Sequence, residues 1–128
     1  MIQKFLEDFY ETISFEQGEQ FKADKFRTFF LSDSVLMESI NGEFRQKNID
    51  EHISEFEYAI KEYPQLFSQG FHEEQTEYTF IENNNCILVS SKFQKSYCRN
   101  GEEVIETGIN NMLLVRYNSG FKIASILW

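Results

Sequence analysis

The sequence predicts an α+β fold in which amphipathic helices fill the first half and a long-stranded antiparallel sheet fills the second. Apolar residues recur at helical spacing up to Tyr63, whereas no helical period survives from Phe71 onward. Turns rich in Asn and Gly then divide the second half into four strands. We expect one domain over residues 1–128, because this length is typical of a domain and no linker interrupts it.

Apolar spacing predicts the first two helices. One face of the N-terminal segment carries Ile2, Phe5, Leu6, Phe9 and Ile13, which is the pattern of an amphipathic helix. Phe26, Phe29 and Phe30 stand at i, i+3 and i+4 and predict a second, shorter helix. A brief strand from Val35 to Ile40 is expected next, and the Asn41-Gly42 turn ends it.

The third helix has the clearest boundaries. Asn48 is a good N-cap, and Glu51 three residues later completes the pattern of a capping box. An apolar stripe follows at Ile49, Ile53, Phe56, Ile60 and Tyr63. Pro64 limits the regular part of this helix, and His52 is expected on its polar side.

The Asn100-Gly101 pair predicts a two-residue type I′ hairpin, because both positions tolerate positive φ. Counting back from this turn pairs Phe93 with Gly108 and Ser91 with Asn110. Lys95 then faces Glu106, which suggests a cross-strand ion pair. Gly108 is a candidate bend or bulge in these long strands.

A three-residue loop over 118–120 would pair Leu114 with Ala124 and Met112 with Ile126. One sheet face then holds Val89, Phe93, Tyr97, Met112, Leu114, Ala124, Ile126 and Trp128, with Ser91 and Asn110 as polar islands. We assign this face to the side that the helices cover, because amphipathic helices need an aromatic surface to bury against. Leu113, Val115 and Ile123 are assigned to the outer face.

Composition excludes several function classes. The net charge of −9 repels phosphate backbones and anionic lipids, so neither nucleic acid nor a membrane is expected as a partner. Acidic residues near the N-terminus are unlike a secretory signal, which favours a cytoplasmic location. Cys86 and Cys98 would lie roughly 40 Å apart on one strand, which is too far for a disulfide.

Motifs for cofactor and metal chemistry are missing from the sequence. It contains no Gly-rich phosphate loop, no Gly-x-Ser-x-Gly elbow and no Cys-His pair with an orienting group. The two histidines, His52 and His72, stand apart from any set of convergent carboxylates. We therefore expect no metal site and no cofactor.

The order of elements, together with two C-terminal stretches, resembles the nuclear transport factor 2-like superfamily. These stretches are Gly-Ile-Asn-Asn-Met-Leu-Leu-Val and Gly-Phe-Lys-Ile-Ala-Ser-Ile-Leu-Trp. The superfamily also holds ketosteroid isomerase-like and polyketide cyclase-like enzymes. The resemblance implies a cone, in which a strongly curved antiparallel sheet wraps three helices, a pocket opens at the wide end and the sheet pairs into a homodimer.

Residues can be matched to the isomerase-like enzymes of that superfamily. The stretch from Phe30 to Glu38 resembles their Phe-Ala-Asp-Asp-Ala segment and the strand after it, which places Glu38 where their carboxylate base stands. Asn110 falls close to a second acidic residue that stabilises an oxyanion. Phe9 replaces a tyrosine of their first helix, and Tyr10 beside it is expected to point about 100° away.

Three functions follow as hypotheses. The first is binding of a small apolar molecule in a cavity of roughly 300 Å³ or more inside the cone. Its candidate ligand-binding residues are Tyr78, Ser91, Phe93, Asn110, Met112 and Trp128. The second is an isomerase- or cyclase-type enzyme with Glu38 as the base and Asn110 as the hydrogen-bond donor. The third is a dimeric interaction module with a filled cone and an apolar outer face.

Structural alternatives remain open at each of these positions. Glu38 could be a solvated carboxylate at a strand end, and Trp128 and Tyr78 could serve as core residues alone. Ser91 and Asn110 could satisfy each other or a buried water molecule.

Overall fold

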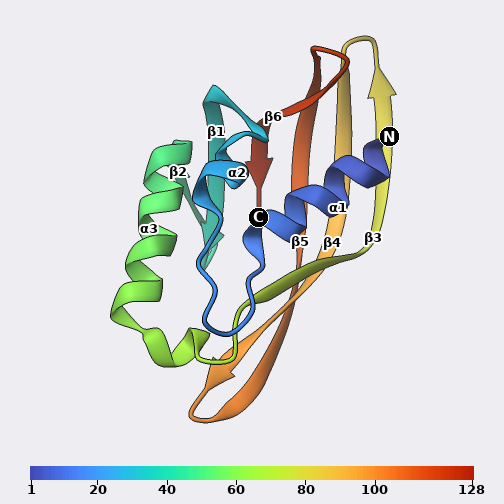
Figure 1. Cartoon of the computed structure of the whole chain (residues 1–128). Coiled ribbons are helices and arrows are strands. Elements are labelled where there is room, and N and C mark those ends of the chain that lie inside the picture. Colours follow the sequence, from blue (N-terminus) through green and yellow to red (C-terminus); the bar gives the residue numbers. More distant parts are fainter.

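A computed structural model describes residues 1–128 and has three helices and six strands (Figure 1). In chain order the elements are α1 (Ile2–Ile13), α2 (Ala23–Arg27), β1 (Phe30–Ile40), β2 (Glu43–Lys47), α3 (Ile49–Glu62), a 3₁₀ turn (Pro64–Phe67), β3 (His72–Asn83), β4 (Cys86–Arg99), β5 (Glu102–Tyr117) and β6 (Gly120–Leu127). The strands form one sheet in the order β2-β1-β6-β5-β4-β3. Only the β1–β6 pair is parallel, so the predicted α+β class is confirmed.

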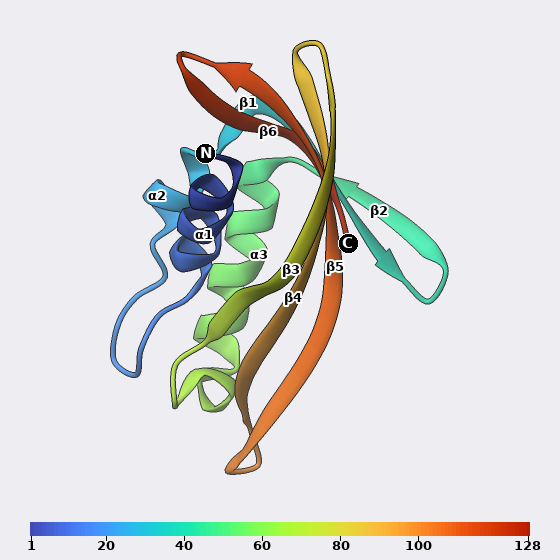
Figure 2. The ribbon, with the colours of Figure 1, turned by 90° about the vertical axis from the view of Figure 1, so that its right-hand side faces the viewer.

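The sheet is curved, and the three helices lie on one side of it (Figure 2). The main core lies between these layers and contains sixteen buried residues, including Leu6, Leu36 and Leu114. Aromatic residues make up 16% of the sequence, and several of them contribute to this core. The predicted arrangement of a curved sheet around three helices is therefore confirmed. No helix in the structure combines the length and the hydropathy that crossing a membrane would require.

The second helix is shorter than predicted and the first strand is longer. The helix α2 ends at Arg27, and Phe30 already belongs to β1. Phe30 pairs with Ile123 of β6, so a strand contact distant in sequence overrides the local helical spacing. The short strand β2, which pairs antiparallel with β1 across the Asn41-Gly42 turn, was not predicted.

The third helix follows its sequence signals closely. The Asn48 side chain accepts a 2.8 Å hydrogen bond from the Glu51 backbone N–H. The Glu51 carboxylate accepts one of 3.0 Å from the Asn48 backbone N–H, which completes the predicted capping box. Helix α3 ends at Glu62, and Pro64 begins the 3₁₀ turn.

The predicted register between β4 and β5 is confirmed. Asn100 and Gly101 have φ angles of 52° and 78°, as a type I′ turn requires, and Ser91 lies opposite Asn110. Gly108 pairs with Phe93 without any register shift, so of the two alternatives predicted there, a bend or a bulge, the bulge is wrong. The ring of Phe93 takes the space above Gly108, because a Cβ at that glycine would lie 2.5 Å from the Phe93 Cζ.

The last turn differs from the prediction by one residue. Tyr117 pairs with Gly120 across a two-residue turn, and Ile123 rather than Ala124 faces Leu114. A bulge then restores the predicted pairing of Met112 with Ile126. As a consequence Ile123 is fully buried in the core, and its predicted place on the outer face is wrong.

Candidate functional site

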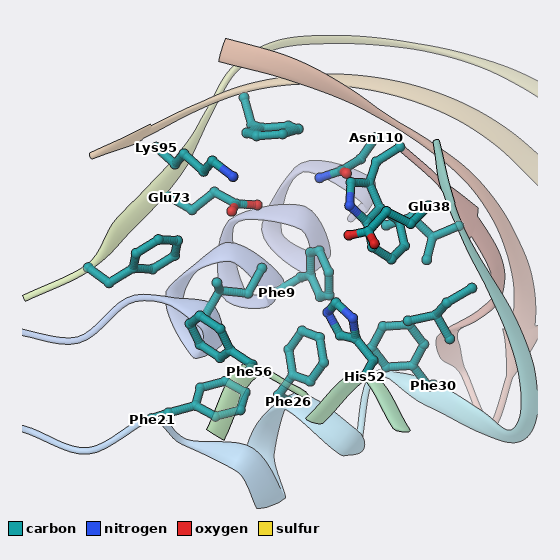
Figure 3. Close-up of a pocket in the computed structure, with 16 residues that line it drawn as sticks. Phe9, Phe21, Phe26, Phe30, Glu38, His52, Phe56, Glu73, Lys95 and Asn110 are labelled. Atoms are coloured by element: carbon teal, nitrogen blue, oxygen red, sulfur yellow. The ribbon is translucent and has the colours of Figure 1, made fainter. Parts of the chain in front are cut away.

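A cavity of about 230 Å³ lies between the helices and the inner face of the sheet. Eleven of its sixteen lining residues are hydrophobic, which gives it mostly apolar walls. Phenylalanine rings from α1, α2, α3, β1 and the loop before α2 make much of this wall (Figure 3): Phe9, Phe21, Phe26, Phe30 and Phe56. The cavity is smaller than the expected 300 Å³, because the Phe side chains occupy part of the cone.

Polar side chains enter this cavity from two sides (Figure 3). Glu73 of β3 and Lys95 of β4 lie together on one side. Glu38 of β1 and His52 of α3 lie on the other, and Asn110 of β5 projects between them. The chain therefore brings together five polar groups from five elements.

Glu73 is held at the start of β3 by the end of the first helix. The Ser14 hydroxyl accepts a 2.9 Å hydrogen bond from the Glu73 backbone N–H and donates one of 3.1 Å to the Glu73 carbonyl oxygen. Next to them, Phe15 and Phe71 form a small antiparallel bridge. These bonds fix the backbone from which the Glu73 side chain reaches the cavity.

Burial raises the pKa of the Glu73 carboxyl group from 4.5 to about 7. The nearby Lys95 ammonium and the Asn110 amide lower this pKa, but their effect is smaller than that of burial. The protonation state of Glu73 therefore changes near neutral pH. Such a group can both give and take a proton under physiological conditions.

Lys95 points into the cavity rather than toward its expected partner. The register does place Lys95 opposite Glu106, but the Glu106 carboxylate accepts a 2.6 Å hydrogen bond from the Tyr97 hydroxyl instead. The predicted ion pair is therefore wrong. Lys95 shares the inner face with Phe93, and this alternation was the sequence signal that could have assigned it to the pocket.

Glu73 was missed as a site residue for a related reason. It lies opposite Lys95 in the β3–β4 pair, so it belongs to the same inner face. A register shift between Gln75 and Glu77 interrupts the alternation on β3. Counting along the sequence from the turn at 84–85 therefore gives the wrong face for the residues before the shift.

A buried hydrogen-bond chain lies beside the cavity. The Asn110 amide donates to the Tyr10 hydroxyl at 2.9 Å, and the Ser91 hydroxyl donates to the Gln75 side-chain carbonyl at 2.7 Å. Because Ser91 has one proton, the 2.7 Å bond between Tyr10 and Ser91 must use the Tyr10 proton. Burial also raises the Tyr10 pKa to about 12, so this phenol stays neutral.

Tyr10 is the inward tyrosine of the first helix, which corrects the sequence expectation. Tyr10 is only 3% exposed, and its hydroxyl reaches the sheet between Ser91 and Asn110. Phe9 also faces inward, because both lie on the side of α1 that packs on the sheet and on α2. The apolar face of α1 is thus wide enough to include two adjacent aromatic residues.

Glu38 lines the opposite side of the cavity, and most of its side chain is shielded from solvent. Its side chain is 25% exposed, and a carboxylate oxygen lies 3.8 Å from the Lys47 Nζ. Lys47 is almost fully buried, binds Glu55 at 2.8 Å and lies 5.1 Å from the centre of the Trp128 ring. Arg45 also pairs with Glu55. Two positive and two negative groups therefore lie at or behind this end of the cavity, and only Glu38 among them lines it.

The imidazole of His52 forms part of the cavity wall, so its predicted place on the polar side of α3 is wrong. Its ring lies 5.9 Å from the Phe26 ring and 5.2 Å from the Trp128 ring. Its Nδ1 atom is buried without a hydrogen-bond partner. Burial, with a smaller effect from Lys47, lowers the His52 pKa to about 4. His52 is therefore neutral at physiological pH.

No protein-family model matches the sequence, and no similar sequence was found among curated proteins. Solved structures do resemble the chain. A protein of unknown function with a cystatin-like fold from Nostoc punctiforme has a TM-score of 0.68 at 12% identity, covering 98% of this chain and 85% of that one. An NTF-2 like protein of unknown function from Shewanella oneidensis has a TM-score of 0.62 at 17% identity, with coverages of 98% and 93%.

The chain has the nuclear transport factor 2-like fold. A third structure supports this, a provisionally named scytalone dehydratase from Novosphingobium aromaticivorans. It has a TM-score of 0.75 at 12% identity and covers 98% of this chain and 78% of that one. At such identities the likeness concerns the nuclear transport factor 2-like fold alone.

Within this nuclear transport factor 2-like fold, the six candidate ligand-binding residues separate into two groups. Phe93, Asn110 and Trp128 line the cavity. Ser91 is fully buried in the hydrogen-bond chain, and Met112 is a core residue with 2% exposure. Tyr78 packs against the edge of the core and stacks on Phe80. No three His, Cys, Asp or Glu side chains lie together as metal ligands would.

Proposed function

We propose that the protein binds a compact, mainly apolar small molecule inside the cone. The observation that carries this proposal is the cavity of about 230 Å³ with eleven hydrophobic lining residues and a few convergent polar groups. This combination is typical of ligand sites, in which apolar walls supply affinity and polar groups orient the ligand. The volume restricts the ligand to one or two rings.

The sole tryptophan allows a direct test, because Trp128 lines the cavity. Naphthol, a compact two-ring probe, should shift the indole N–H signal of Trp128 in a saturable NMR titration. Ile13→Phe should abolish this shift, because Ile13 lines the cavity and the larger ring would occupy it. The matched control is Ile109→Phe on the outer face, where the side chain is 43% exposed. An absent shift, or one that survives Ile13→Phe, would contradict the proposal.

An enzyme that transfers protons is the second candidate. Glu38 and Asn110, the base and donor suggested by the resemblance, line the same cavity. Glu73 adds a second carboxyl group whose pKa of about 7 suits acid–base chemistry at neutral pH. The provisional name of the Novosphingobium structure also points to an enzyme of the dehydratase class.

Tetralone, a two-ring ketone, is a suitable probe for this second candidate. The protein should speed the exchange of its α-protons for deuterium, followed by NMR in deuterated water. Glu38→Gln should lower the rate by about 100-fold or more if Glu38 is the base. Glu73→Gln tests the other carboxyl group separately. Exchange at the buffer rate in the presence of bound tetralone would exclude this activity.

Self-association through the sheet remains a proposal as well. The outer face exposes a row of apolar side chains, of which Ile81, Leu88, Ile105 and Ile109 are each 43–64% exposed. These residues lie away from the helices, on strands β3, β4 and β5. A second copy of the chain could cover them, which is compatible with a ligand inside the cone.

A further inference from the structure

The two sides of the cavity differ in their ion pairs. At the Glu38 side the charged groups form salt bridges, whereas the Lys95 ammonium at the Glu73 side forms none. Lys95 is the only Lys or Arg that lines the cavity. None of the eight salt bridges in the structure includes it. Its ammonium group faces the Glu73 carboxyl group inside the cavity (Figure 3). When Glu73 holds a proton, this side of the cavity carries one unbalanced positive charge.

At the Glu38 side of the cavity, every charged group has a partner of opposite charge. Lys47 pairs there with Glu38 and Glu55, and Arg45 pairs with Glu55. The two positive charges therefore neutralise the two negative ones. His52 is neutral because burial lowers its pKa to about 4. A charged ligand group would therefore be recognised at the Lys95 side.

We propose that the ligand is a compact aromatic or alicyclic carboxylic acid, bound as its carboxylate by Lys95 and Asn110, with protonated Glu73 donating a hydrogen bond to it. This inference rests on the proposed function and names its ligand class. Lys95 supplies the opposite charge, and a carboxyl group and an amide supply charge-assisted hydrogen bonds. The phenylalanine rings bury the hydrocarbon part of the acid.

Binding then involves a proton. In molecules where Glu73 is ionised, the complex forms from the ligand carboxylate, the Glu73 carboxylate and one proton taken from solvent. Without that proton two carboxylates would face each other in an apolar site, which is unfavourable. A cationic ligand is disfavoured, because its positive charge would lie beside the Lys95 ammonium group.

No titratable group on the neighbouring elements α1, α3 and β1 competes with Glu73 for this proton. Tyr10 on α1 stays neutral with a pKa of about 12, and His52 on α3 stays neutral with a pKa of about 4. Glu38 on β1 lies across the cavity beside Lys47. Glu73 is thus the group at this site that changes charge near pH 7.

Three probes of one shape test the inference: naphthoate, naphthamide and naphthylmethylamine. Calorimetry at pH 8 should show naphthoate binding about tenfold or more tightly than the amide. Repeating the titration in buffers of different ionisation enthalpy should show that naphthoate binding takes up protons, with at most one proton per naphthoate. Tighter binding of the amide or the amine would overturn the acid assignment while leaving the proposed apolar site intact. Binding of none of the three would overturn both.

Variants separate the roles of the two residues. Lys95→Met should weaken naphthoate about tenfold or more and leave naphthamide unchanged. Lys92→Met is the matched control, because Lys92 lies on the same strand, is half exposed and pairs with Glu77 outside the cavity. Glu73→Gln should retain naphthoate binding but lose the proton uptake. Equal effects of the two lysine variants, or unchanged proton uptake in Glu73→Gln, would contradict the inference.

Discussion

The Asn110 side-chain amide donates a 2.9 Å hydrogen bond to the Tyr10 hydroxyl, which joins the first helix to the inner face of the sheet across one hundred residues of sequence. The same hydroxyl bonds Ser91 on the neighbouring strand. One phenol therefore holds α1 against β4 and β5 and sets the position of Asn110 beside the cavity. This contact therefore contributes both to the stability of the fold and to the geometry of the site.

Tyr10→Phe should destabilise the protein by about 1–3 kcal/mol, because it leaves Ser91 and Asn110 without a buried partner. The free energy of unfolding in urea measures this loss. Tyr58→Phe is the matched control, because Tyr58 is 61% exposed on α3 and should show no loss. If both variants unfolded at the same urea concentration, the buried chain would not be stabilising.

Gly108→Ala should cost about 1–3 kcal/mol through overpacking, because the new Cβ would lie 2.5 Å from the Phe93 Cζ. The double variant with Phe93→Leu should recover part of that loss, since the clashing ring is removed. A double-mutant cycle of unfolding free energies gives the coupling between the two positions. Purely additive effects would show that Gly108 is needed for another reason.

Glu73 should make the protein less stable as the pH rises. Its folded pKa of about 7 lies above its ordinary value of 4.5, so between these values the unfolded chain releases a proton that the folded chain keeps. Stability attributable to Glu73 is present below pH 4.5 and falls by about 3 kcal/mol as the pH approaches 7.

His52 should act in the opposite direction. Its folded pKa of about 4 lies below its ordinary value of 6.5, so the unfolded chain takes up a proton first as the pH falls. Its contribution therefore rises with pH between 4 and 6.5 by about 3 kcal/mol and offsets that of Glu73.

Urea unfolding across pH 4 to 7.5 can separate these two effects. Glu73→Gln should reveal a stability that rises with pH, whereas His52→Leu should reveal one that falls. The wild-type profile should be flatter than either. Parallel profiles for all three proteins would show that neither group is perturbed by burial.

Leu88→Lys should prevent self-association if the outer sheet face joins two copies. Leu88 is 48% exposed on β4, and a buried lysine at an apolar contact would be costly. Sedimentation velocity should give a dimer for the wild type and a monomer for the variant. Tyr58→Lys adds the same charge on α3 and should leave the dimer intact. A monomeric wild type at high concentration would refute the dimer.

Prediction from sequence succeeded where a few adjacent residues decide the structure. The capping box at Asn48 and Glu51 and the turn at Asn100-Gly101 are local, and both formed as expected. Counting from that turn also placed Asn110 opposite Ser91. The error at Ala124 follows from a turn one residue shorter than predicted, and Glu73 was missed because a register shift on β3 separates it from the turn at 84–85. In both cases one residue more or less reverses every side chain beyond it.

The sequence by itself determined the α+β class, the third helix, the β4–β5 register and the inward face that carries Phe93, Asn110 and Trp128. Only the tertiary structure decided that Tyr10 and His52 point inward and that Glu73 and Lys95 share the cavity. The reason is physical: periodicity fixes which residues share a face of one element. How far each helix rotates, and where a strand bulges, depends on packing among aromatic side chains that are distant in sequence.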